Sequence, residues 1–147
     1  MKKIILSLIA VFALTTAVSA QNNAIGIRLA AGSAFGAEIS YQTAMAASNR
    51  IEIDLGMNFG GFSAISLAGM YHWQVGLSDG FGLFIGPGAQ AVLIEEYFSL
   101  GVGGQAGIEY SFPSVPFQIS LDVRPMYNIL SHYGFYWGGA LGIRYTF

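Results

Sequence analysis

The amino-acid sequence predicts an all-β protein, namely an eight-stranded antiparallel up-and-down transmembrane β-barrel preceded by a cleavable signal peptide. Three observations predict it: the composition, the alternation of side chains along the chain, and the placement of the charged residues. Of the 147 residues, 54% are hydrophobic and 10% are charged, whereas an ordinary soluble domain has roughly 25% charged residues. This composition excludes a disordered chain. The formal net charge of −2 excludes a basic nucleic-acid-binding protein, so no nucleic-acid partner is expected.

Residues 1–20 have the features of a secretory signal peptide. Two lysines open the segment, an apolar run from 4 to 14 follows, and small residues lead up to Ala20. This order matches a positive start, an apolar centre and a small-residue cleavage site. The apolar run is shorter than the ~20 residues that a membrane-spanning helix needs. We therefore expect cleavage after Ala20 and a barrel domain over residues 21–147.

The rest of the sequence alternates between apolar and polar side chains with a period of two, the pattern of strands with two unlike faces. In 117–128, for example, most apolar side chains occupy odd positions and most polar side chains even positions. Pro125 interrupts this strand and predicts a bulge or irregularity in its pairing. Connections rich in glycine, proline and asparagine separate the alternating segments. The predicted strands are 24–32, 34–43, 50–59, 63–75, 81–93, 97–111, 117–128 and 135–147.

The charged residues indicate which face of the predicted sheet is turned inward. In a membrane barrel, aliphatic side chains contact lipid and polar side chains fill the lumen, the reverse of a soluble barrel. After residue 20, no charged residue falls on the apolar face of a predicted strand, and Arg50, Asp79, Glu95 and Glu96 lie in or beside turns. We expect the other charged residues to form an ion-pair network in the lumen. These residues are Arg28, Glu38, Glu52, Asp54, Glu109, Asp122, Arg124 and Arg144.

Glycine and aromatic residues favour the same arrangement. Many of the 20 glycines share the less apolar face, and the narrow lumen of an eight-stranded barrel needs small residues. Aromatic residues fall near the strand ends, as in the two interfacial girdles of membrane barrels. One expected rim contains Tyr41, Tyr71, Trp73, Phe81, Tyr110, Phe112, Phe117, Tyr145 and Phe147, and the other contains Phe35, Phe59, Phe62, Tyr97, Phe98, Tyr127, Phe135 and Trp137. The barrel must be closed, because an open sheet edge in hydrocarbon would leave backbone groups unsatisfied.

The predicted last strand ends in Gly142-Ile143-Arg144-Tyr145-Thr146-Phe147. With this segment and its eight predicted strands, the chain resembles the small eight-stranded outer-membrane β-barrel proteins of Gram-negative bacteria. The resemblance covers all of 21–147 and is architectural, and Ala140 stands where a polar residue is more usual. It implies a monomer in the outer membrane, in contact with outer-membrane lipid. It also implies insertion by the barrel assembly machinery, which would read Gly142, Tyr145 and Phe147.

For the function, the sequence favours a non-enzymatic structural or housekeeping barrel with a polar, largely plugged lumen and with neither cofactor nor metal site. His72 has lumen parity and is expected to join the internal polar network. Three alternatives stay open: a narrow pore lined by glycine, a lipid-modifying enzyme that uses Ser131 and His132, and a soluble barrel that carries an apolar ligand. The enzyme alternative has no acidic residue near Ser131 and His132 in the sequence, whereas catalysis needs an oriented set of groups.

Overall fold

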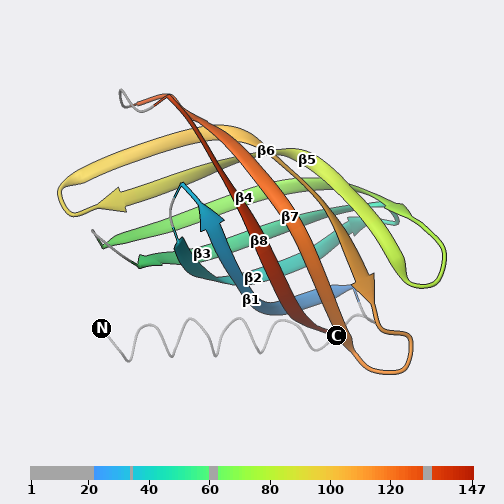
Figure 1. Cartoon of the computed structure of the whole chain (residues 1–147). Helices are drawn as coiled ribbons and strands as arrows, with labels where there is room; N and C mark the ends of the chain where they lie inside the picture. Colours follow the sequence, from blue (N-terminus) through green and yellow to red (C-terminus); the bar gives the residue numbers. More distant parts are fainter. Residues whose placement is uncertain (1–21, 34, 60–62, 131–133) are drawn as a thin grey trace.

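In the computed structural model the strands form one closed barrel, in which each strand pairs antiparallel with the next and β8 pairs with β1 (Figure 1). The structure describes residues 22–33, 35–59, 63–130 and 134–147. The predicted signal peptide lies outside these residues. The strands are β1 (Asn23–Gly32), β2 (Phe35–Ala46), β3 (Asn49–Phe59), β4 (Ala64–Gly76), β5 (Phe81–Ile94), β6 (Tyr97–Ser111), β7 (Phe117–Asn128) and β8 (Phe135–Thr146).

All eight predicted strands are present, and their ends agree with the structure to within three residues. The largest difference is at the end of β2, where the pairing with β3 shifts between Ala44 and Ala46. Such a bulge adds a residue to one strand and lets it continue into the turn. No helix in the described part of the chain is long and apolar enough to cross a membrane.

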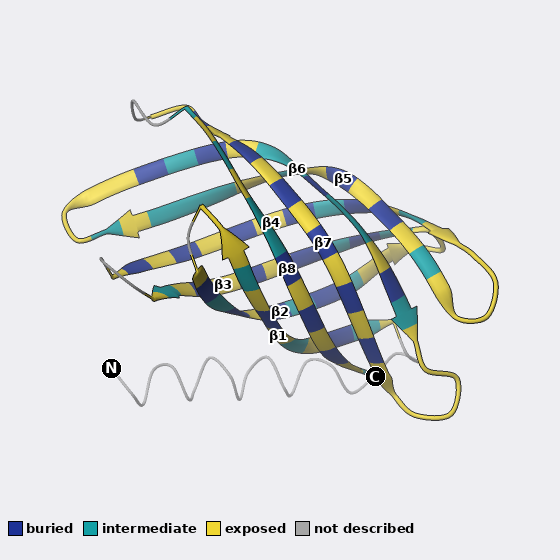
Figure 2. Cartoon of the chain, viewed as in Figure 1, coloured by how far each residue is buried: buried dark blue, intermediate teal, exposed yellow. Residues whose placement is uncertain are grey.

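The alternation of buried and exposed residues is regular along the strands, as Figure 2 shows. Every odd-numbered residue of β7 is exposed and every even-numbered residue is buried. The exposed residues are the apolar ones: on β1, Ile27 and Leu29 are 58% and 52% exposed, whereas Arg28 between them is 1% exposed. Apolar side chains therefore cover the outside and charged side chains fill the inside, which is the arrangement of a membrane barrel. The predicted fold class is confirmed.

Two prolines interrupt the pairing of neighbouring strands without changing the register. Pro87 leaves β4 and β5 unpaired between Met70–Gly88 and Trp73–Ile85. Pro125 leaves a similar gap between β6 and β7. Because proline has no backbone N–H, it removes one hydrogen bond from each ladder. The irregularity expected at Pro125 is thus present as a gap in the pairing, with no shift of register and therefore no bulge.

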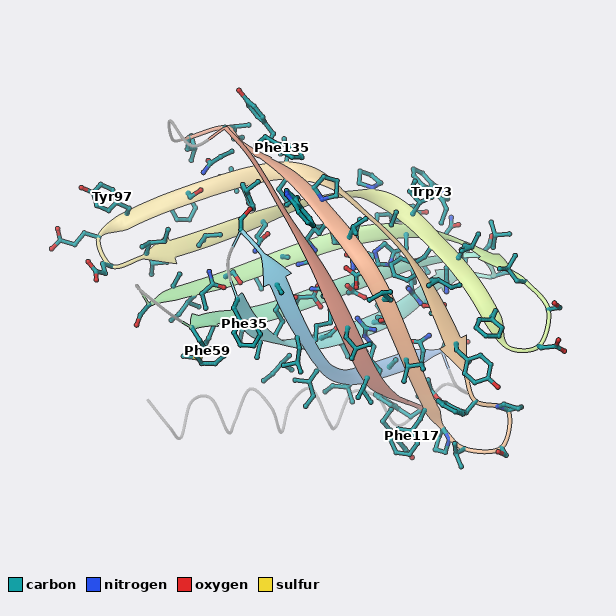
Figure 3. The ribbon with its side chains drawn as sticks, in the orientation of Figure 1. Phe35, Phe59, Trp73, Tyr97, Phe117 and Phe135 are labelled. Atoms are coloured by element: carbon teal, nitrogen blue, oxygen red, sulfur yellow. The ribbon has the colours of Figure 1, made fainter. Side chains whose placement is uncertain are left out.

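Aromatic side chains gather near both ends of the barrel. We call the end that holds Asn23 and Phe147, which are hydrogen-bonded through their backbones, the terminal rim. There, ring centroids of Phe117 and Tyr145 lie 5.8 Å apart. Toward the opposite rim lie Phe35, Phe59, Tyr97 and Phe135, whereas Trp73 and Phe117 lie toward the terminal rim (Figure 3). Aromatic residues in two such bands are typical of membrane–water interfaces.

Candidate functional site: the barrel interior

Charged side chains from five strands meet in the middle of the barrel, and we call this group the ionic layer. Each of its side chains is at most 8% exposed. Their strands present them inward because they occupy alternate positions, which all face the same side of a sheet. The ionic layer consists of Arg28, Glu38, Glu52, Asp54, Asp122, Arg124 and Arg144.

Arg28 joins β1 to its neighbour β2 and to β7, which lies beyond β8. It is the register partner of Glu38 across β1 and β2, and its Nη1 donates to that carboxylate. Its Nε and Nη2 donate to the two oxygens of Asp122 on β7, with the Nε–Oδ2 distance at 3.2 Å. A guanidinium that binds a carboxylate through two parallel hydrogen bonds gives both strength and a fixed geometry.

Glu52 accepts hydrogen bonds at both of its oxygens. Arg144 Nη2 lies 2.9 Å from Oε2, and Gln105 Nε2 lies 3.0 Å from Oε1. Gln42 also donates to Oε2, and Arg124 Nη2 is 3.5 Å from Oε1. Since every donor favours the ionised carboxylate, Glu52 is the best-stabilised negative charge of the ionic layer.

The other two arginines complete the ionic layer. Arg124 donates to Asp54 Oδ2 and to Glu38 Oε1 at 3.3 Å. Arg144 donates to the hydroxyl groups of Ser40 at 3.0 Å and Ser120 at 2.7 Å. The three arginines thereby link β1, β2, β3, β7 and β8 across the lumen.

A further chain of polar contacts leads from the ionic layer toward the terminal rim. His72 Nε2 lies 3.3 Å from Gln105 Oε1, and Arg50 Nε donates to His72 Nδ1 at 3.1 Å. Arg50 Nη1 is 2.7 Å from Glu109 Oε2, and its guanidinium lies 4.8 Å from the ring centre of Phe84. Because an arginine can only donate, His72 Nδ1 is the acceptor and the proton of the neutral ring is on Nε2.

Arg50 corrects the sequence analysis, which placed it with the charged residues in or beside turns. It lies inside β3, is paired with His72 of β4, and is only 4% exposed. The predicted strand 50–59 already contains Arg50, and because Arg50 and Glu52 occupy alternate positions of β3, both side chains face inward.

Next to the ionic layer, the interior becomes apolar. Ala68, Met70 and Met126 are each 1% exposed and pack as one cluster, with Tyr136 against it. We call these four residues the apolar layer. They come from β4, β7 and β8, and they have the same parity as the buried polar residues of those strands, such as His72, Asp122 and Arg144. Alternation alone therefore does not reveal that this part of the lumen is apolar.

Glycines on β5 and β6 make room for the apolar layer. A Cβ atom at Gly88 would lie 2.1 Å from Met70 Sδ, and one at Gly103 would lie 2.8 Å from Met126 Sδ. Real Cβ atoms do not approach other atoms so closely, and in a close-packed interior the neighbouring side chains have little room to shift. The space that the sequence suggested as a glycine-lined path is thus filled by methionine at these positions.

The structure places all eight of the predicted lumen residues inside the barrel. Seven form the ionic layer, and Glu109 instead pairs with Arg50 nearer the terminal rim. His72, which was expected in the polar network, is fully buried there. Ser131 and His132 lie outside the described residues. Sequence reasoning missed Gln105 and the two methionines, although all three have inward parity.

Two hollows lie near turns of the terminal rim. One, of about 340 Å³, is lined by Gln74, Glu109 and Ser111 among others, and Gln74 Nε2 donates to Glu109 at 3.1 Å. The other, of about 420 Å³, surrounds the turn between β6 and β7. Over 22–33, 35–59, 63–130 and 134–147, no three His, Asp or Glu side chains are placed to hold a metal ion.

The last strand closes the barrel against β1. Tyr145 points outward and is 47% exposed, and Phe147 exchanges backbone hydrogen bonds with Asn23 at 2.9 and 3.0 Å. Gly142 faces inward, where a Cβ atom would lie 2.5 Å from Ser120 Oγ. Gly142 is therefore required for packing inside the barrel as well as being a predicted recognition residue.

Several solved structures are similar to this chain in fold. The N-terminal β-barrel domain of Pseudomonas aeruginosa OprF matches with a TM-score of 0.67 at 16% identity, covering 88% of this chain and 100% of that one. Neisserial surface protein A matches with a TM-score of 0.65 at 15% identity, over 85% and 95% of the two chains. The Yersinia pestis outer membrane protein Ail, in a phospholipid bilayer nanodisc, matches with a TM-score of 0.58 at 13% identity, over 87% and 100%.

Comparison by sequence adds nothing to this likeness, because no family model and no curated protein matches the chain. The chain has the fold of the small eight-stranded outer-membrane β-barrel proteins. At such low identity the likeness concerns the fold, and the role of the protein has to be argued from its own residues.

Proposed function

We propose that this protein is a closed, non-enzymatic barrel of the outer membrane with a structural role and a sealed lumen. The observation that supports it most directly is the filled interior. Ionic-layer side chains from strands that are not neighbours meet in ion pairs, and the apolar layer packs against glycines beside them. We expect these two groups of side chains to stop ions and small solutes.

The outer surface supports placement in a membrane. Its strands expose aliphatic side chains such as Ile85 at 62% and Leu121 at 60%, and the four arginines of the barrel domain are all buried. An arginine on the lipid face would cost ~2–4 kcal/mol at the bilayer midplane. The surface is therefore suited to lipid as its surroundings, and a soluble carrier of an apolar ligand is disfavoured.

Fractionation and gel migration test the membrane placement. We expect the protein in the detergent-soluble outer-membrane fraction, with an unboiled band that migrates differently from the boiled one because the closed barrel resists detergent. Recovery in the soluble periplasmic fraction without detergent would contradict the proposal.

Planar-bilayer recordings test the sealed lumen against the narrow-pore alternative. A barrel closed by both layers is expected to give no discrete openings. A variant with Met70→Ala and Met126→Ala serves as the matched control, because it removes the bulk of the apolar layer and leaves the ionic layer intact. Discrete openings of the unmodified protein would show that the lumen conducts.

The non-enzymatic part of the proposal is tested at Ser131 and His132. Replacing His132 by Ala is expected to leave the lipid A profile of the cell unchanged.

We further propose that the barrel assembly machinery reads Gly142, Tyr145 and Phe147, so that Phe147→Ala slows insertion. Cross-linking of purified protein in mild detergent should detect a monomer.

A further inference from the structure

The ionic layer contains one more carboxylate than guanidinium. Three arginines face four carboxylates, and all seven side chains are at most 8% exposed. The neighbouring Arg50 is engaged by Glu109 at 2.7 Å, and His72 is neutral because its Nδ1 accepts from Arg50. The ionic layer thus has one negative charge in excess, inside a barrel whose outer surface is apolar. An uncompensated buried charge is so costly that the group takes up a proton instead.

The hydrogen bonds identify the carboxyl that takes the proton. Both oxygens of Asp122 accept from Arg28, and both oxygens of Glu38 accept from Arg28 or Arg124. Glu52 accepts at both oxygens as well. Asp54 differs: Arg124 donates to its Oδ2, whereas its Oδ1 is buried without a hydrogen-bond partner.

We propose that Asp54 Oδ1 is a proton-binding site and that the folded barrel holds this carboxyl in its neutral form at neutral pH. Asp54 is 1% exposed, so water does not compete for the proton. With the proton bound, three carboxylates balance three guanidinium groups and the ionic layer is neutral. The charged and titratable groups around Asp54 are Arg28 of β1, Glu38 of β2, Glu52 of β3, His72 of β4, Asp122 and Arg124 of β7, and Arg144 of β8.

This site couples the stability of the barrel to pH. In the unfolded chain Asp54 is exposed and ionised at neutral pH, so the folded state binds one proton more than the unfolded state. The free energy of unfolding then falls as pH rises. The stabilisation by the bound proton is complete only at acid pH, below the range in which an exposed aspartate ionises. Each pH unit raises the unfolding constant by about tenfold through this one group. Above the pH at which the folded barrel releases the proton, the ionic layer carries a net negative charge and its seal is weakest.

Asp54→Asn tests the site, because the amide has the shape of the neutral carboxyl and cannot ionise. The protein is purified from membranes in detergent and unfolded in urea between about pH 5 and about pH 8. This range lies above the ordinary pKa of an exposed aspartate and includes that of a histidine. We expect the ratio of wild-type to variant unfolding constants to rise by about tenfold per pH unit. Ser120→Ala is the matched control, because it removes a contact of Arg144 without changing the charge of the ionic layer, so its unfolding constant should be higher than that of the wild type by the same factor at every pH.

A spectroscopic readout keeps the test independent of folding yield. Infrared spectra of the folded wild-type protein should show the C=O stretch of a protonated carboxyl, and Asp54→Asn should lack it. Absence of that band in the wild type, or a wild-type to variant ratio that does not change with pH, would overturn the proposal. So would a loss of stability when sodium is replaced by choline, because a bound metal cation would then supply the missing charge.

Discussion

The ionic and apolar layers fill the same lumen by opposite means. In the ionic layer, Arg28 and Asp122 lie 94 residues apart in the chain and meet inside the lumen, and each contact depends on a particular partner in a particular orientation. In the apolar layer, Met70 and Met126 fill space left by glycines, and any side chain of the right volume would serve. The contacts of the ion pairs therefore depend on how the strands are arranged, whereas those of the apolar layer depend mainly on volume.

The difference follows from what remains when one side chain is removed. Removing one member of a buried ion pair leaves a charge without a partner, which costs several kcal/mol. Removing a methionine leaves a cavity, whose cost depends on how far the surroundings collapse. The following variants test the contrast between the layers, with the free energy of unfolding measured by urea titration in detergent.

Arg28→Ala should have the largest effect. It leaves Glu38 and Asp122 without the guanidinium that both accept from, and the expected loss is about 3–5 kcal/mol. The double variant with Asp122→Asn should recover part of that loss. A cost below about 1 kcal/mol, the value for exposed ion pairs, would mean that water reaches the ionic layer.

Met126→Ala should cost about 2–5 kcal/mol, because the side chain is 1% exposed and its removal leaves a cavity. Met126→Leu, which keeps the volume, should cost less than about 1.5 kcal/mol. Equal losses for the two variants would show that methionine has a role beyond filling space.

Gly88→Ala should cost about 1–3 kcal/mol by overpacking, since the new Cβ atom would lie 2.1 Å from Met70 Sδ and 2.4 Å from the Gly69 carbonyl oxygen. Gly69→Ala is the matched control on the neighbouring strand. A Cβ atom at Gly69 has no atom within 4 Å, so that variant should change stability by less than about 0.5 kcal/mol. Similar losses at both positions would contradict the close packing of the apolar layer.

Deletion of a single hydroxyl should have opposite signs in the two layers. Tyr136 Oη is buried without a hydrogen-bond partner, so Tyr136→Phe should leave stability unchanged or raise it by about 1 kcal/mol. Ser120 Oγ accepts from Arg144 at 2.7 Å, so Ser120→Ala should cost about 1.5–3 kcal/mol. A clear loss of stability in both variants would contradict this difference between the two layers.

Strand positions and facing were predictable because a strand has a period of exactly two residues. Arg28, Asp122 and Arg124 could be assigned to the lumen from parity alone, since a slip by one residue would place each of them in lipid. Arg50 has the same parity as Glu52, but it was left out of the predicted network because it lies next to a turn, where a bulge at Ala44–Ala46 decides how far the ladder extends. Turn geometry depends on pairing with a second strand and is weakly encoded in local sequence.

The contents of the lumen were predictable only in part. Parity shows that Met70, Met126 and Tyr136 point inward, but it does not show that they lie together, because they come from three separate strands. The same holds for Asp54, whose inward position was expected and whose free oxygen was not.

Composition and periodicity alone were enough to predict a barrel with apolar side chains outside and charged side chains inside, the reverse of a soluble barrel. Both can be recognised strand by strand. Closure of the sheet decided the rest. It brings residues from distant strands to the same height of the lumen, sets three guanidinium groups against four carboxylates, and places methionine opposite glycine. Those contacts depend on the stagger of all eight strands together, and for that reason no individual segment of the chain encodes them.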